Sequence, residues 1–171
     1  NMLLFVGGIL LLSAMQTTAL DYAFFHKDID TEIAKLPTTT TNLRFVSSPT
    51  THLKAFLFQR LTSLEGLCIN KSELISVDDD AFTGTNISNL YLNDNSITTM
   101  PNLTTISASL VFLDLSSNRI AAVPRGFFHG MTALRIFHFD NNQLIQFPDF
   151  SSLPRSNVLS FISIENNSLS N

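Results

Sequence analysis

The sequence predicts an α/β solenoid: a right-handed superhelix in which each coil adds one short parallel β-strand to a concave sheet and returns through irregular or 3-10 segments. Two observations predict this fold. Apolar residues recur in one fixed pattern roughly every 24 residues, which is the period of neither a helix nor a strand. In addition, an asparagine or a serine stands at the same place in every copy of the pattern.

The pattern is clearest in residues 110–123, where apolar side chains stand eight, five and three residues before Asn118 and two and five residues after it. Six copies have the anchor residues Ser48, Ser72, Asn95, Asn118, Asn142 and Asn167, so the steps are 24, 23, 23, 24 and 25 residues. Their apolar positions are Leu43, Phe45 and Leu53; Leu64, Leu67, Ile69, Leu74 and Val77; Ile87, Leu90, Leu92, Ile97 and Met100; Leu110, Leu113, Leu115, Ile120 and Val123; Leu134, Phe137, Phe139, Leu144 and Phe147; and Leu159, Ile162, Ile164 and Leu169.

Each copy begins with a short strand, such as Leu113-Asp114-Leu115, whose two leucines face the interior because strand side chains alternate. Neighbouring coils then pair their strands in parallel, about 4.8 Å apart. The chain must turn sharply after each strand, and the asparagines of a structural ladder are expected to hydrogen-bond backbone groups in that turn: Asn95, Asn118, Asn142 and Asn167. Ser48 and Ser72 can do only part of this, so we expect the first two coils to be less well fastened.

The return side of the coils is predicted to be filled by a second set of large apolar residues: Phe58, Phe82, Leu103, Phe128 and Phe150. This set accounts for a composition with 15 phenylalanines and no tryptophan. A single coil cannot bury its apolar side alone, so stability must come from stacking.

Residues 40–169 resemble the leucine-rich repeat family, whose pattern is L-x-x-L-x-L-x-x-N-x-L. "VDDDAFTGT" (77–85) and "VPRGFFHGM" (123–131) resemble the tail of the extracellular type of repeat. "MPNLTTIS" (100–107) and "FPDFSSLP" (147–154) keep the proline but are shorter, so we expect irregular rather than helical returns there. The resemblance implies a secreted or cell-surface recognition protein. The chain departs from the family in one respect, because its N-terminal segment has no cysteine.

We divide the 171 residues into three parts. Residues 1–19 are expected to be a secretory signal peptide, being apolar and ending in small residues before a cleavage site; the alternative is a membrane anchor, for which the stretch is short. Residues 20–41 would form an uncrosslinked N-terminal cap around Tyr22, Phe24, Phe25, Ile29, Ile33 and Leu36. Residues 42–171 would hold about six repeats, the last incomplete, and we expect the chain to be a fragment of a longer protein.

Four N-x-S/T sequons are consistent with export and are candidate glycosylation sites: Asn70, Asn86, Asn102 and Asn166. Asn86 and Asn102 fall on the return side and are the better candidates. The only cysteine, Cys68, should point outward from its strand. It either pairs with a cysteine of another chain or is a tolerated small residue.

Three columns of side chains are predicted to face the concave side: Asn42, Gly66, Asn89, Phe112, Ile136 and Phe161; Arg44, Cys68, Tyr91, Asp114, His138 and Ser163; and Val46, Asn70, Asn93, Ser116, Asp140 and Glu165. Exposed apolar residues edged by charge are typical of a partner-binding surface. We therefore expect a protein or glycan ligand at Tyr91, Phe112, Asp114, Ile136, His138, Asp140, Phe161 and Glu165.

Two other site chemistries can be read from the same columns. Ser116, His138 and Asp140 share the residue types of a hydrolase triad, but an open sheet offers no oxyanion donors and excludes no water. Asp114, His138 and Asp140 could hold a metal ion, yet three ligands on a flat face lack supporting groups. We therefore expect no catalysis, metal or cofactor.

The sequence thus predicts a non-catalytic recognition module. The alternative is the ectodomain of a membrane receptor of the innate immune or adhesion type, with contact to a membrane only through an anchor beyond Asn171. A net charge of −4 and the lack of a basic patch argue against nucleic acid.

Overall fold

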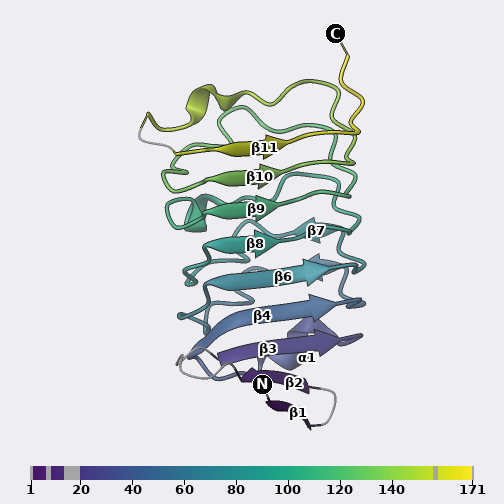
Figure 1. The fold of residues 1–171 in the computed structure, drawn as a ribbon, viewed down its shortest axis with the longest axis vertical. Coiled ribbons are helices and arrows are strands. Elements are labelled where there is room, and N and C mark those ends of the chain that lie inside the picture. The colour runs from purple at the N-terminus through teal and green to yellow at the C-terminus, as the bar shows by residue number, and fades with distance from the viewer. Residues whose placement is uncertain (1, 7–8, 14–19, 156–157, 171) are drawn as a thin grey trace.

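A computed structural model describes residues 2–6, 9–13, 20–155 and 158–170 as a stack of coils that share one nine-stranded sheet (Figure 1). The sheet order is β1-β2-β3-β4-β6-β8-β9-β10-β11. Its strands are β1 (Met2–Val6), β2 (Ile9–Ser13), β3 (Leu20–Phe25), β4 (Thr40–Val46), β6 (Gly66–Asn70), β8 (Asn89–Tyr91), β9 (Phe112–Asp114), β10 (Ile136–His138) and β11 (Phe161–Ser163). From β3 onward every pairing is parallel, whereas β1, β2 and β3 pair antiparallel.

The predicted register of the repeats is confirmed. Leu67 pairs with Leu90, Leu90 with Leu113, and Leu113 with Phe137. The inward residues of these central strands are fully buried, as are the apolar residues of the turns that follow, such as Ile97 and Ile120. The interior is therefore a continuous apolar core that runs through the stack, as expected for coils that stabilise one another.

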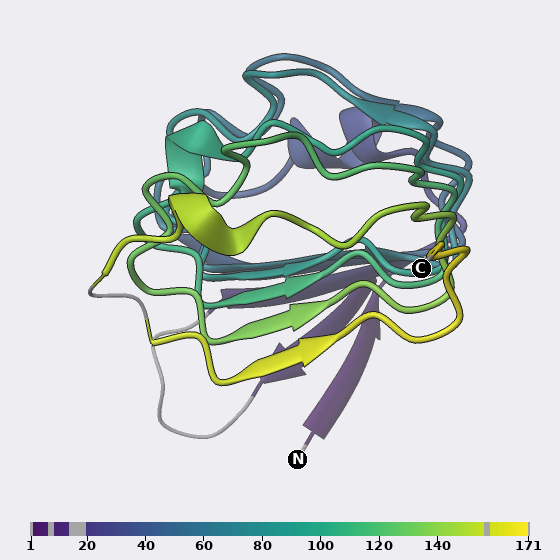
Figure 2. The same ribbon diagram turned by 90° about the horizontal axis from the view of Figure 1, so that it is seen from above.

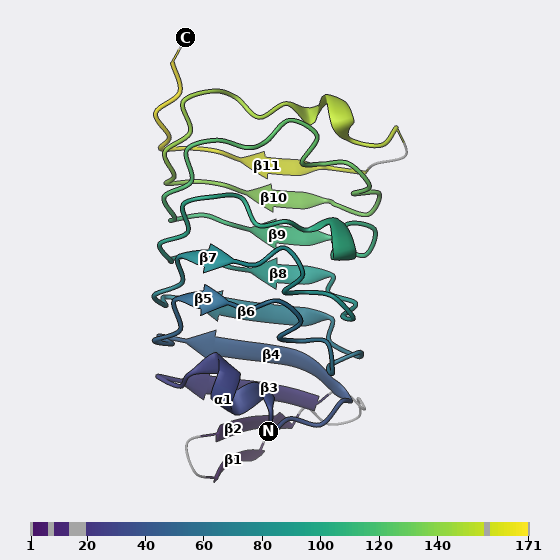
Figure 3. The ribbon, with the colours of Figure 1, turned by 180° about the vertical axis from the view of Figure 1, so that it is seen from behind.

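The return wall lies opposite the sheet, as the view along the stack shows (Figure 2). It carries helix α1 (Ile29–Ile33), the 3-10 helices η1 (Thr104–Ile106) and η2 (Phe150–Ser152), and the small parallel sheet of β5 (His52–Leu53) and β7 (Ser76–Val77), best seen from behind (Figure 3). The prediction of irregular or 3-10 returns is confirmed, because the segments 100–107 and 147–154 each hold a single 3-10 turn and are otherwise irregular.

Phenylalanine rings fill the space behind the sheet, as predicted. Phe58 stacks on Phe82 with ring centroids 6.1 Å apart, and Phe128 stacks on Phe150 at 4.6 Å. Leu103 is buried in the coil between these two pairs. The core is thus filled from the sheet side and from the return side by apolar residues that recur once per coil.

Four residues predicted to be interior are exposed. Phe25 is the outward neighbour of the buried Phe24 in β3, and strand alternation forces one of the two into solvent. Phe147 is 66% exposed because the next residue, Pro148, takes the buried position in its coil. Ile162 and Leu169 belong to the coil of β11, which has no described strand on its far side.

Residues 20–36 add a further coil to the stack, with β3 parallel to β4 and α1 as its return. Asp28 caps this helix, accepting from the backbone N–H of Thr31 at 3.0 Å. In each of the six repeats, the residue before the turn anchor has a left-handed backbone with φ between 49° and 55°: Ser47, Lys71, Asp94, Ser117, Asn141 and Asn166. His26 has the same conformation, with φ 54°, at the equivalent position of the first coil. The segment is therefore built like the repeats that follow it.

The segment expected to be a signal peptide contributes β1 and β2 to the edge of the sheet. Its predicted cleavage position, next to Ala19, lies outside the described residues. No helix within the described ranges is long and apolar enough to span a bilayer. Whether residues 1–19 are removed stays a prediction.

Candidate ligand-binding face

The outward face of the nine-stranded sheet carries the three predicted columns in the predicted register. In the middle column, Cys68 pairs with Tyr91, Tyr91 with Asp114, and Asp114 with His138. In the first column, Phe112 pairs with Ile136 and Ile136 with Phe161. The strands therefore bring together side chains that lie 23 to 25 residues apart in the chain.

Four rings form a zigzag line across adjacent strands of this face, and we call Tyr91, Phe112, His138 and Phe161 the aromatic line. Successive ring centroids are 4.6, 5.5 and 5.2 Å apart, and each pair is tilted by 32° to 46°. The sequence predicted a strip within the first column only. The contacts instead alternate between the first and middle columns, because rings on adjacent strands reach each other diagonally. Phe161 is the most exposed ring of the line, at 50%.

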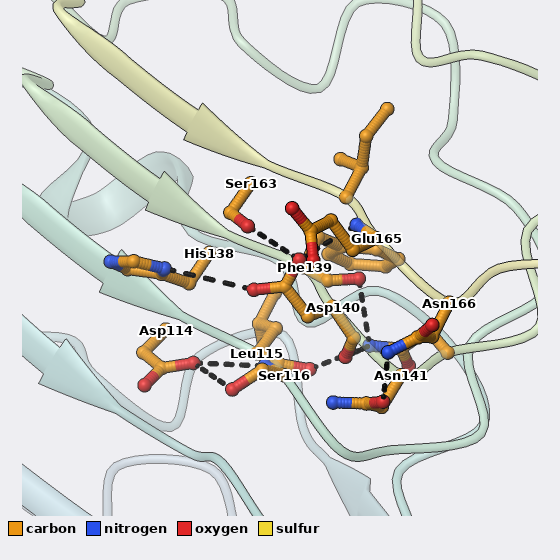
Figure 4. Close-up of polar contacts among 12 residues, drawn as sticks. Asp114, Leu115, Ser116, His138, Phe139, Asp140, Asn141, Ser163, Glu165 and Asn166 are labelled. Carbon is orange, nitrogen blue, oxygen red and sulfur yellow. Dashed lines mark hydrogen bonds and ion pairs between the residues drawn. The ribbon is translucent and has the colours of Figure 1, made fainter.

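Asp114, Asp140 and Glu165 lie on the same side of the sheet as the aromatic line, and Figure 4 shows them around His138. Asp140 Oδ1 accepts from Ser163 Oγ at 2.5 Å and from the backbone N–H of Glu165 at 2.7 Å, while its other oxygen lies 3.8 Å from His138 Nδ1. Asp114 Oδ1 accepts from the N–H and the hydroxyl of Ser116. Both aspartates are half-buried and fixed in place, so they present negative charge beside the rings at little entropic cost.

The hydrolase arrangement of Ser116, His138 and Asp140 is not assembled. The hydroxyl proton of Ser116 is donated to Asp114 Oδ1 at 2.5 Å, so it is not directed at the imidazole of His138. Among the described residues, no three His, Cys, Asp or Glu side chains are placed to share a metal ion. The Ser116 hydroxyl is therefore engaged by Asp114 in this structure.

The asparagine ladder forms as predicted. Asn118 Nδ2 donates to the carbonyls of Leu92, Leu115 and Ser116 at 2.9, 3.1 and 3.2 Å, and its Oδ1 accepts from Ile97 N at 3.0 Å. Asn95, Asn142 and Asn167 repeat this set of bonds in their own coils. Each asparagine thus ties its own turn to the preceding coil.

The serine anchors make fewer bonds, in line with the expectation for the first coils. Ser72 Oγ accepts from Ser48 N at 2.9 Å and donates to the carbonyl of Asn70 at 3.0 Å. Thr50 had no predicted role, yet its hydroxyl accepts from Ile29 N at 3.0 Å, the bond that an asparagine side chain makes in later coils. The turn chemistry is therefore shared between two residues here.

Cys68 lies in the middle column and is partly covered. Burial raises the pKa of its thiol, with Asp114 adding to the rise and Arg44 opposing it. Burial likewise raises the pKa of the Tyr91 phenol. Both groups are therefore neutral at pH 7, which makes Cys68 a slow nucleophile.

The four sequons differ in exposure. Asn86 and Asn166 are exposed, while Asn70 and Asn102 are partly covered. Asn70 ends β6, on the sheet face that carries the aromatic line. The carbonyl oxygen of the Asn102 side chain accepts from the N–H and hydroxyl of Thr104 at 3.0 and 2.8 Å. Glycosylation of any of them stays a prediction.

The family model described as "Leucine rich repeat" matches residues 108–169. No curated protein matches the chain. Among solved structures, a TLR13–ssRNA13 complex superposes with a TM-score of 0.77 at 23% identity, covering 87% of this chain and 22% of TLR13. An internalin, InlF, from Listeria monocytogenes str. 4b F2365 superposes with a TM-score of 0.65 at 21% identity, covering 85% of this chain and 39% of the internalin. At these identities the likeness concerns the fold, and this chain spans less than half of either protein.

Proposed function

Starting from a chain built of leucine-rich repeats, we propose that it is a non-catalytic recognition module that binds a protein through the outward face of its sheet. The aromatic line is the observation that carries the proposal. Four rings in mutual contact on an open sheet face offer the apolar anchor that protein interfaces use, and the carboxylates beside them fix the orientation of a partner.

The charge of this face specifies the partner further. Asp114 pairs with His138 across adjacent strands, and Asp140 Oδ2 lies 3.8 Å from His138 Nδ1. Figure 4 shows Glu165 next to Asp140. We therefore expect a protein that presents an apolar side chain to the rings and a lysine or arginine to the carboxylates. Such complementarity raises the rate of association and selects against acidic partners.

We place the module in an extracellular setting, as a secreted protein or as part of a receptor ectodomain. The apolar N-terminal segment and the four sequons support this placement. The receptor alternative is compatible with the likeness to TLR13, which is far longer than this chain.

A nucleic acid ligand deserves a direct test, because the TLR13 structure is of a complex with ssRNA13. We expect no binding of nucleic acid, because Arg44 is the only lysine or arginine in the three columns, whereas Asp114, Asp140 and Glu165 are acidic. Phosphate contacts require clustered lysine or arginine. Filter binding of labelled single-stranded RNA at low salt measures this, and tight, salt-sensitive retention would contradict the proposal.

The main experiment screens the multimerised chain against arrayed extracellular proteins and measures the affinity of each captured protein. Phe112→Ala and Phe161→Ala should each weaken a genuine partner by about 30-fold, the loss typical of a central anchor. Phe147→Ala is the matched control, because Phe147 is an exposed phenylalanine that lies outside the sheet face. Equal affinities for all four proteins would reject the proposed surface.

The hydrolase alternative makes the opposite prediction. Esterase and peptidase substrates should show no turnover that depends on His138. Turnover by the wild-type chain that disappears in His138→Ala, with the fold intact by circular dichroism, would establish the enzyme instead.

A further inference from the structure

A hollow of about 290 Å³ lies on the same sheet face over β3, β4, β6 and β8, at the opposite end from Phe161. Its polar wall consists of Asp21, Asn42, Arg44, Asn89 and Tyr91. This volume is at the lower limit for ligand pockets, which suits a ligand smaller than a drug molecule. Apart from Tyr91, none of these residues belongs to the surface proposed for the protein partner.

Small residues create the hollow. Ala23, Gly66 and Cys68 occupy positions on its floor that Phe112 and His138 fill farther along the sheet. A Cβ on Gly66 would lie 2.2 Å from Asn42 Oδ1, so a larger residue there would push the Asn42 side chain out of its place. The depth of the hollow therefore depends on glycine at this position.

The charges around the hollow balance. Arg44 is exposed, and no acceptor among the described residues hydrogen-bonds its guanidinium. Asp21 supplies one carboxylate, whose Oδ1 accepts from Asn42 Nδ2 at 2.7 Å. A charged ligand would meet one attractive and one repulsive group here, whereas an uncharged ligand with hydroxyls can accept from Arg44 and donate to Asp21.

Tyr91 lines the hollow with its apolar ring as well as with its polar hydroxyl. One side of its ring packs against Phe112, with centroids 4.6 Å apart, and the side chain also lines the hollow. Next to it, Asn70 Oδ1 is buried and has no hydrogen-bond partner among the described residues, in an adjoining hollow lined by Arg44, Cys68 and Tyr91. A buried acceptor without a donor is costly, and a hydroxyl is one group that can satisfy it.

We propose that this hollow binds one uncharged sugar ring, held by hydroxyl contacts to Asp21, Arg44 and Asn89 and by its C–H face against Tyr91. A protein side chain of this size has a single polar end, whereas the hollow presents a guanidinium donor, carboxylate and amide acceptors and an aromatic ring on different walls. Sugars match that combination because each hydroxyl both donates and accepts.

The test uses the methyl glycosides of glucose, galactose and mannose as probes in saturation-transfer NMR and calorimetry on the wild-type chain. We expect at least one to bind, with a dissociation constant on the order of 1 mM, as suits a ligand of so few atoms. Glucuronate and glucosamine, which carry a charge, should bind no more tightly than the neutral glycosides, because the attraction of each to one of Asp21 and Arg44 is offset by repulsion from the other.

Substitutions in and outside the hollow test whether the sugar binds there. Arg44→Gln and Tyr91→Ala should each weaken the sugar at least about tenfold, and Gly66→Ala should block it by displacing Asn42. Arg119→Gln is the matched control, because Arg119 is exposed and does not line the hollow. Arg44→Gln alters one exposed side chain and keeps the test valid if Gly66→Ala fails to fold.

Three results would overturn the proposal: no glycoside binding at concentrations about tenfold above 1 mM, tighter binding of a charged probe, or undiminished binding by Arg44→Gln. Phe161→Ala separates this proposal from the recognition of a protein. That variant should lose the protein partner and keep the sugar, so either function can fail without the other.

Discussion

Replacing Asn118 by alanine tests how the coils are fastened together. Asn118 is only 7% exposed, and its side chain bonds to backbone groups of two successive coils. Alanine removes the acceptor of Ile97 N–H at 3.0 Å and the donor to the Leu92 carbonyl at 2.9 Å, both in the preceding coil. It leaves a space where the amide stood, without changing the apolar core.

The expected loss follows from these two buried groups. Leaving a buried donor or acceptor without a partner costs about 1–3 kcal/mol, so two such groups predict a fall of about 3 kcal/mol in the free energy of unfolding after partial relaxation. Water entering the space would reduce this figure, and loss of the further bonds to Leu115 and Ser116 would increase it.

Urea unfolding followed by circular dichroism measures the change. Asn93→Ala is the control, because Asn93 Nδ2 bonds to the neighbouring carboxylate of Asp94 at 2.8 Å and to no other coil. We expect the control to lose less than about 0.5 kcal/mol, as surface substitutions do. If Asn118→Ala were no less stable than Asn93→Ala, the proposed role of the ladder would be refuted.

Three further predictions use other parts of the fold. Ser117 has φ 53°, so Ser117→Gly should raise the free energy of unfolding by about 0.5 kcal/mol and Ser117→Val should lower it by about 1–2 kcal/mol; equal stabilities in urea would contradict this. Because burial raises the pKa of Cys68, its thiol should react with a disulfide reagent near neutral pH more slowly in the folded chain than in urea, and equal rates would show that burial does not suppress its ionisation. The backbone N–H of Thr31, together with hydroxyl bonds, lowers the pKa of Asp28 below 3.8 in the folded chain, so Asp28 stabilises the fold above that pH and this contribution is lost as the pH falls through the lowered pKa. The stability difference between wild type and Asp28→Ala should therefore shrink on acidification, and a constant difference would exclude the linkage.

The register of the fold could be predicted because its information is spread over many copies. One missing or unusual residue does not disturb a spacing that five other coils repeat, so Leu90, Leu113 and Phe137 were placed side by side from the sequence. The same spacing placed the three outward columns, from which the aromatic and acidic residues of the candidate face follow.

Residues 20–36 were expected to form a cap because Lys27 stands where the later coils have asparagine or serine, although Tyr22, Phe24 and Ile29 keep the apolar spacing of those coils. A signal was nevertheless present, since the residue before every turn anchor is polar and its equivalent in the first coil is His26. The hydrogen bond of Thr50 was also not predicted. Thr50 stands two residues after Ser48, where the later coils have an apolar residue, so the spacing does not indicate that its hydroxyl replaces an asparagine side chain.

The ring contacts of the candidate face depend on the direction in which each side chain points, and the spacing of residues in the sequence does not determine that direction. Phe112 and His138 belong to different columns, and only their rotamers bring the rings to 5.5 Å. The hollow beside Arg44 depends on the space above Gly66, a property of several neighbouring side chains together.

The most direct test of the account is a solution NMR measurement of proton–proton contacts among the aromatic rings of the unbound chain. Winding into stacked coils predicts cross-peaks from Tyr91 to Phe112, from Phe112 to His138 and from His138 to Phe161, whose ring centroids lie 4.6, 5.5 and 5.2 Å apart. If these cross-peaks were absent in a folded sample, the rings would not form one line, and the surface proposed to bind a protein would not exist.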